Sequence, residues 1–92
     1  MKIIYRIRLW ANRKRSAKIG RGLLRLNTPE KVREAIEADG TVIPRAEELY
    51  RLMVERANLH LKLGEVQEYR RVSIGIRIMN GHIYNLKQAA SA

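Results

Sequence analysis

Hydrophobic and polar residues alternate along residues 2–10, which is the pattern of a β-strand with one face in a protein core. One face of this strand consists of Ile3, Tyr5, Ile7 and Leu9. The opposite face, directed to solvent or to a ligand, consists of Ile4, Arg6, Arg8 and Trp10. Residues 11–22 contain two glycines, five bases and one isolated isoleucine. We interpret them as a mobile connection, with a helix over part of them left open, and a short strand follows over residues 23–26.

The next segment predicts a helix from its start signals. Thr28 can cap it, Pro29 suits the first helical position, and Glu30 lies at the positive end of the helix dipole. This helix should run to about Asp39 and stop at Gly40.

A second helix should begin at Pro44 and end at Leu63, with Gly64 as the residue that follows its last turn. Its first turn contains Glu47 and Glu48. Its apolar residues recur at helical spacing and are Leu49, Leu52, Met53, Leu59 and Leu63. Core packing explains this stripe more simply than a partner does, because so small a domain has little else to bury.

The last part of the chain predicts a β-hairpin. Its first strand alternates strictly, with Val72, Ile74, Ile76 and Ile78 on one face. Asn80-Gly81 is the dipeptide preferred in two-residue type I′ turns. The return strand, residues 82–87, would place Tyr84 beside Arg77 across the ladder.

Together these elements predict a single α+β domain over residues 1–87. The economical packing is a small antiparallel sheet with both helices on one face. Residues 88–92 give no reason for order and are expected to form a flexible tail.

Charge points to the partner. The 92 residues have a net charge of +10, which attracts polyanions such as nucleic acid, an anionic membrane or an acidic protein. Residues 1–29 hold nine bases and no acid, residues 30–68 hold all nine acids against six bases, and residues 69–92 hold four bases and no acid. If the two ends of the chain meet in one sheet, one side of the molecule is almost purely cationic.

The candidate binding residues follow from this distribution. Basic side chains can contact phosphates, Asn12 can reach the edge of a nucleobase, and Trp10 can stack on an unpaired nucleobase. The predicted nucleic-acid-binding residues are Trp10, Asn12, Arg13, Lys14, Arg15, Lys18, Arg21, Arg25, Arg70, Arg71 and Arg77. The alternatives are a solvated loop, a core or sheet-edge position for Trp10, and a cross-strand packing pair of Arg77 with Tyr84.

The sequence gives little support for catalysis, metal binding or membrane contact. His60 and His82 lack further ligands at metal spacing, and no cluster places a general base, so we expect no enzyme activity, metal, cofactor or small-molecule substrate. No apolar run reaches the roughly 18 residues of a membrane span. No helix is expected to pair an apolar face with a basic one, so we expect no membrane contact. With no cysteine, the chain suits the cytoplasm.

Two resemblances suggest a biological setting. Tyr5-Arg6-Ile7 and the segment from Tyr69 to Tyr84 are faintly similar to RelE-type mRNA-cleaving toxins, which combine two helices with a small sheet. Their C-terminal basic and aromatic catalytic cluster is not evident after Leu86.

In size, lack of cysteine and lack of a domain signature, the chain also resembles phage-encoded anti-CRISPR proteins. This resemblance implies a protein of the bacterial host cytoplasm. It would bind a CRISPR surveillance complex, contact guide RNA or Cas proteins, and block target DNA. A general RNA-binding or ribosome-associated protein is the further alternative.

Overall fold

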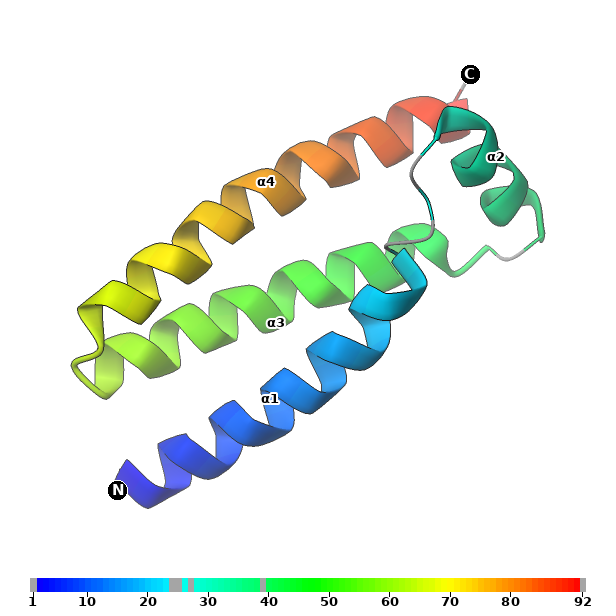
Figure 1. Cartoon of the computed structure of the whole chain (residues 1–92). Helices are drawn as coiled ribbons and strands as arrows, with labels where there is room; N and C mark the ends of the chain where they lie inside the picture. Colours follow the sequence, from blue (N-terminus) through cyan, green and yellow to red (C-terminus); the bar gives the residue numbers. More distant parts are fainter. Residues whose placement is uncertain (1, 24–25, 27, 39, 92) are drawn as a thin grey trace.

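The computed structural model describes residues 2–23, 26, 28–38 and 40–91 (Figure 1). In this described part of the chain all regular structure is helical. The helices are α1 (Lys2–Leu23), α2 (Pro29–Ala38), α3 (Val42–Lys62) and α4 (Val66–Ser91). The predicted α+β fold is therefore wrong, because the described residues form no strand and no sheet.

The three long helices lie in the order α1, α3, α4 (Figure 1). Both α1 and α4 pack on α3, which runs antiparallel to them, and the backbones of α1 and α4 do not come close to each other. The short helix α2 contacts α4 and α3 at the end of the molecule where α4 finishes. The result is elongated, with extents of 46 × 20 × 16 Å.

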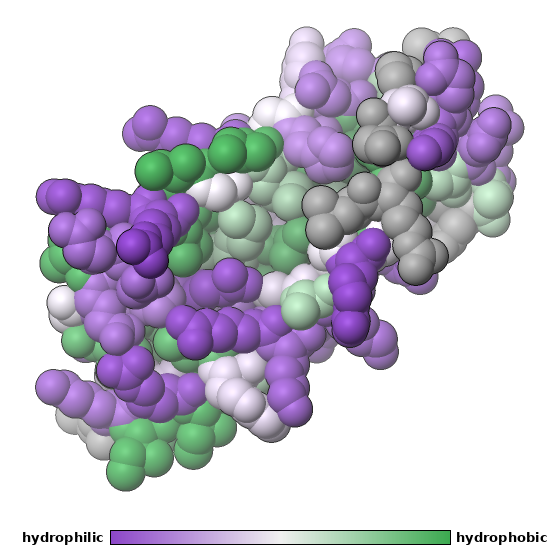
Figure 2. Space-filling model, in the orientation of Figure 1, coloured by the Kyte–Doolittle hydropathy of each residue, from purple (hydrophilic) through white to green (hydrophobic). Residues whose placement is uncertain are grey.

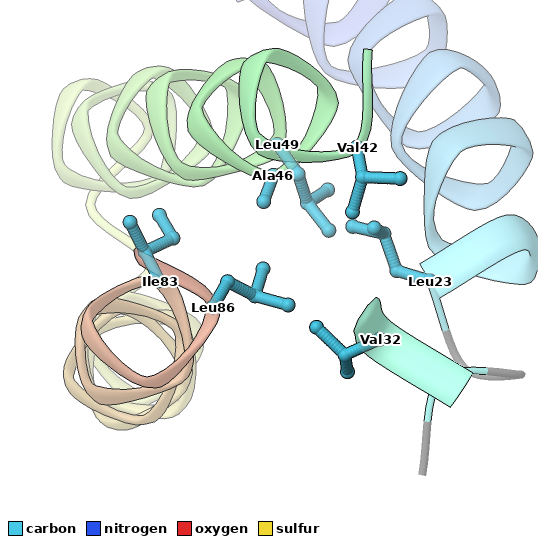
Figure 3. Close-up of a cluster of buried hydrophobic side chains, with 7 residues drawn as sticks. All are labelled: Leu23, Val32, Val42, Ala46, Leu49, Ile83 and Leu86. Atoms are coloured by element: carbon cyan, nitrogen blue, oxygen red, sulfur yellow. The ribbon is translucent and has the colours of Figure 1, made fainter. Parts of the chain in front are cut away.

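The apolar core lies toward the α2 end. Its buried side chains come from all four helices and are Leu23, Val32, Val42, Ala46, Leu49, Ile83 and Leu86 (Figure 3). Figure 3 shows them pointing toward one another between the helices. Helix α2 covers the core at this end of the molecule only. Among the described residues, no helix fills the rest of the space between α1 and α4.

The predictions for α2 and α3 are confirmed, apart from the predicted end of α2 at Asp39, which lies outside the described residues. The hydroxyl of Thr28 accepts a hydrogen bond from the backbone N–H of Lys31 at 3.2 Å, which caps α2. Helix α3 begins two residues before Pro44. At its end, Gly64 has a positive φ of 74°. Its N–H bonds the Leu61 carbonyl, and the next N–H bonds the His60 carbonyl, which is the Schellman arrangement that favours glycine.

The predicted hairpin is wrong, because residues 66–91 form the single helix α4. Val72, Ile76, Met79, Ile83 and Leu86 recur at spacings of four and three residues and lie on the side of α4 that faces α3. Asn80 and Gly81 are exposed on other sides. Their poor helix propensity, about 1 kcal/mol for glycine, is offset by packing along the rest of the helix. Residues 88–91, expected in the flexible tail, continue α4.

The predictions at the start of the chain are also wrong. Residues 2–10, predicted as a strand, form the first part of α1. Residues 11–22, interpreted as a mobile connection with a helix over part of them left open, continue the same helix. The side of α1 toward α3 consists of Tyr5, Leu9, Asn12, Ser16, Ile19 and Leu23. The polar Asn12 and Ser16 interrupt this helical stripe and hide its period. The predicted strand over 23–26 fails at Leu23, the last residue of α1, and residues 24 and 25 lie outside the described part.

Candidate nucleic-acid interface

Helix α1 concentrates the positive charge of the protein. It carries eight bases and no acid, and these bases are Lys2, Arg6, Arg8, Arg13, Lys14, Arg15, Lys18 and Arg21. All eight side chains are exposed. The charge that the sequence assigns to a mobile connection is therefore arranged on a helix.

A buried amide fixes α1 against α3. Asn12 is 3% exposed, and its Nδ2 donates to the Leu52 carbonyl oxygen at 2.7 Å and to Glu55 Oε1 at 3.0 Å. Its Oδ1 accepts from Ser16 Oγ at 3.2 Å and from Arg56 Nε at 3.1 Å. Both ends of the amide are thus satisfied. A single buried polar pairing of this kind sets the register of two packed helices.

A second polar group ties the start of α1 to the turn between α3 and α4. Glu65 Oε2 lies 3.1 Å from Arg6 Nη1, and Glu65 Oε1 lies 3.0 Å from Nδ1 of the buried His60. A carboxylate only accepts hydrogen bonds, so Nδ1 of His60 carries the hydrogen. The hydrogen bond from His60 lowers the pKa of Glu65, Arg6 lowers it further, and partial burial opposes both.

The outermost row of α1 is divided into two halves. Residues along this row follow one another at spacings of four and three, and they are Ile3, Ile7, Trp10, Lys14, Lys18 and Arg21. The first three are apolar and 74%, 60% and 59% exposed. The last three are basic, and Lys14 Nζ lies 4.2 Å from the centre of the Trp10 ring. A cation and an aromatic ring therefore meet in the middle of the row.

The structure separates the predicted site residues. Trp10, Arg13, Lys14, Lys18 and Arg21 are exposed on α1. Arg15 is exposed too but pairs with Glu48. Asn12, predicted to read a base edge, is buried in the contact with α3. Arg25 lies outside the described residues.

The three predicted arginines of the C-terminal part lie on α4. Arg70 and Arg77 are exposed there without a described ion-pair partner, and Arg71 pairs with Glu68 at 3.2 Å. Because α1 and α4 are helices that each pack on α3, and their backbones do not come close to each other, the two ends of the chain do not meet in one cationic sheet.

Sequence reasoning missed two bases of α3. Arg51 and Lys62 line one hollow of about 480 Å³ together with Arg8 of α1, beside Glu55 and Asn58. They fall in the segment that holds all nine acids, which obscured them. Only their spacing along α3 relative to the predicted leucine stripe could have pointed to them. The cationic surface of α1 therefore extends onto α3.

No protein-family model, no curated protein and no solved structure matches this chain. Among the helices of the described residues, none has the length and apolar content needed to cross a membrane. Nor do three His, Cys, Asp or Glu side chains of that part of the chain group as metal ligands would. The candidate site therefore stands on charge and geometry.

Proposed function

We propose that this protein binds the phosphate backbone of a nucleic acid along the exposed side of α1. One observation carries the proposal: six of the eight bases of α1 have no ion-pair partner among the described residues. They are Lys2, Arg8, Arg13, Lys14, Lys18 and Arg21. Basic side chains without an ion-pair partner displace counterions from the phosphates that they contact. The release of these counterions drives sequence-independent binding.

The helix also supports the proposal through its rigidity and length. Bases on a packed helix are already ordered, so binding does not have to restrict a loop. At 1.5 Å per residue, 22 residues extend about 33 Å, which is close to one turn of a B-form duplex, about 34 Å. Trp10, at the middle of the outer row, offers an aromatic face to an unpaired base.

A salt series with matched charge variants tests this placement. The double variant Lys18→Gln, Arg21→Gln removes two positive charges from α1. The logarithm of the affinity decreases with the logarithm of the salt concentration. If each side chain contacts a phosphate, the magnitude of this slope should decrease by roughly 1.4 to 1.8. The control Arg70→Gln, Arg77→Gln removes the same charge from α4 and should change the slope much less. Fluorescence anisotropy with labelled RNA and DNA measures both, and equal effects would show that only net charge matters.

We propose inhibition of a nucleic acid–protein complex, of the CRISPR surveillance type, as the biological setting. A basic helix can contact guide RNA or occupy the path of target DNA. Expression in a CRISPR-immune bacterium should restore phage plaques, and a failure to restore them would leave a general RNA-binding role. The toxin resemblance relied on a small sheet, which the described residues lack, and we do not carry it further.

An anionic membrane surface is the second candidate. The expectation against it rested on the lack of a helix that pairs an apolar face with a basic one, but the start of α1 does place exposed isoleucines among bases. Ile3 and Ile7 are exposed on its outer row, and Lys2 and Arg8 flank them. Exposed isoleucines beside basic side chains can insert into an anionic lipid interface. Sedimentation with phosphatidylserine vesicles, compared for wild type and Ile7→Glu, tests it, and no cosedimentation of the wild type would exclude it.

A further inference from the structure

An apolar groove runs between α1 and α4, with α3 as its floor. It has a volume of about 530 Å³. Leu49 and Met53 of α3 form the floor, Gly20 and Leu23 lie on the α1 side, and the α4 side consists of Gly75, Ile78, Met79 and His82. The groove exists because α1 and α4 both pack on α3 while their backbones stay apart.

The apolar surface continues beyond the groove. Ile78, on its α4 side, is 69% exposed, and Ile74, one turn earlier, is 61% exposed. Figure 2 shows hydrophobic surface on the α4 side of the molecule, above the hollow between the long helices. A small molecule inside the groove would leave Ile74 and Ile78 in water. A larger partner is needed to cover them.

One end of the groove is cationic. An adjoining hollow shares Leu49 and Met53 with the groove and is also lined by Arg13 and Arg56. Arg56 donates from Nε to Asn12, and neither arginine has a carboxylate partner among the described residues. Burial, together with the charge of Arg13, lowers the pKa of Arg56. Two guanidinium groups therefore face one hollow without a counter-charge.

We propose that this groove binds an acidic amphipathic α-helix of a partner protein. Three helices of more than 20 residues surround an open position, and a fourth helix there would complete a four-helix bundle. The apolar face of the partner would pack on Met53, Met79 and Ile78, since flexible methionines adapt to helical ligands. Its carboxylates would reach Arg13 and Arg56. A net charge of +10 on each chain opposes a second copy as the occupant.

Two glycines provide matched variants. Gly20 lines the groove, and a Cβ built there meets no atom within 4 Å, so Gly20→Leu should fold and fill the groove. Gly81 is also helical and exposed, does not line the groove, and has nothing within 4 Å of a Cβ. Gly81→Leu is therefore the control for the same substitution. Arg13→Gln and Arg77→Gln form a second pair, because each removes one charge but only Arg13 lines the cationic end.

The probe is a labelled peptide that repeats leucine at heptad positions and glutamate elsewhere, with a scrambled peptide of equal composition. Wild type should bind the ordered peptide at least about tenfold more tightly than the scrambled one. Gly20→Leu should lose at least about tenfold and Gly81→Leu less than about twofold. Arg13→Gln should weaken binding more than Arg77→Gln. With methionine methyl groups labelled for NMR, the Met53 and Met79 signals should shift on binding.

Several results would overturn the proposal. These are undetectable binding, equal binding of the two peptides, equal affinity for the two glycine variants, or methionine signals that do not move. A wild-type dimer in solution that Gly20→Leu converts to monomer would assign the groove to a second copy instead. Binding of vesicles that Gly20→Leu abolishes would assign it to a membrane. The phosphate-binding proposal does not depend on this test, because Gly20→Leu leaves every base of α1 in place.

Discussion

Replacement of Asn12 tests how α1 is held on the rest of the protein. Its amide makes four side-chain hydrogen bonds, to Leu52, Glu55, Ser16 and Arg56. Glu55 is exposed and Arg56 is half-buried, so water can replace part of the hydrogen bonding that they lose with Asn12. A net hydrogen bond contributes about 1 kcal/mol, and a buried partner left alone costs more. We therefore expect Asn12→Ala to reduce the free energy of unfolding by about 2 kcal/mol.

Asn12→Asp separates the network from simple loss of packing. The aspartate would retain acceptors for Ser16 and Arg56 but would lose both donors. Its carboxylate would then face the Leu52 carbonyl and the Glu55 carboxylate at the positions where Nδ2 now lies 2.7 and 3.0 Å from them. A buried charge beside two acceptors should cost about 3 kcal/mol or more.

The assay is urea unfolding followed by the helical circular dichroism signal. Ser16→Ala, which removes one hydrogen bond, should cost only about 0.5 to 1 kcal/mol. The expected order of stability is wild type, Ser16→Ala, Asn12→Ala, Asn12→Asp. An Asn12→Asp protein as stable as wild type would refute the network and, with it, the stated register of α1 on α3.

Two further predictions concern α4 and the turn before it. Gly81→Ala should stabilise the protein by about 1 kcal/mol in thermal or urea unfolding, because alanine favours the helix interior, whereas a type I′ turn at this position would make the same change destabilising. Glu65 has a lowered pKa, so its contribution is present above the ordinary value of 4.5 and is lost as the pH falls through the folded pKa. Wild type should therefore be more stable than Glu65→Gln at neutral pH, and the difference should narrow below about pH 4.5; a difference that does not change with pH would contradict the stated bonds to His60 and Arg6.

The sequence was informative where local chemistry fixes an element. Thr28 and Pro29 define the start of α2, and Gly64 ends α3, because capping depends on neighbouring residues alone. It misled for α1 and α4. Their β-branched residues alternate over short stretches, and Asn80-Gly81 suits a hairpin, yet both segments also carry a helical stripe. Packing of this stripe on α3 decides between the two, and that contact joins residues about 40 positions apart, such as Asn12 with Leu52.

The candidate site shows the same division. Charge identified the bases of α1, since a run without acids needs no tertiary information. It could not place them, and the error for Asn12 shows why. An asparagine among arginines suggests a base contact, but one helical turn either side of it lie Leu9 and Ser16, and all three face α3. Whether a polar residue of α1 packs on α3 or is free to contact a ligand depends on the side of the helix that it occupies.

In these two proposals helix α1 presents separate surfaces to separate partners. Its inner side packs on α3 through Leu9 and Asn12, its exposed bases carry the proposed phosphate contacts, and one edge borders the groove toward α4. Arg13 is the one base of α1 that lines the cationic end of the groove and also lacks an ion-pair partner among the described residues. A helix bound in the groove would neutralise it and remove at most one phosphate contact. The two proposed activities are therefore compatible. Binding of one ligand should slightly lower the affinity for the other, and this effect should disappear in Arg13→Gln.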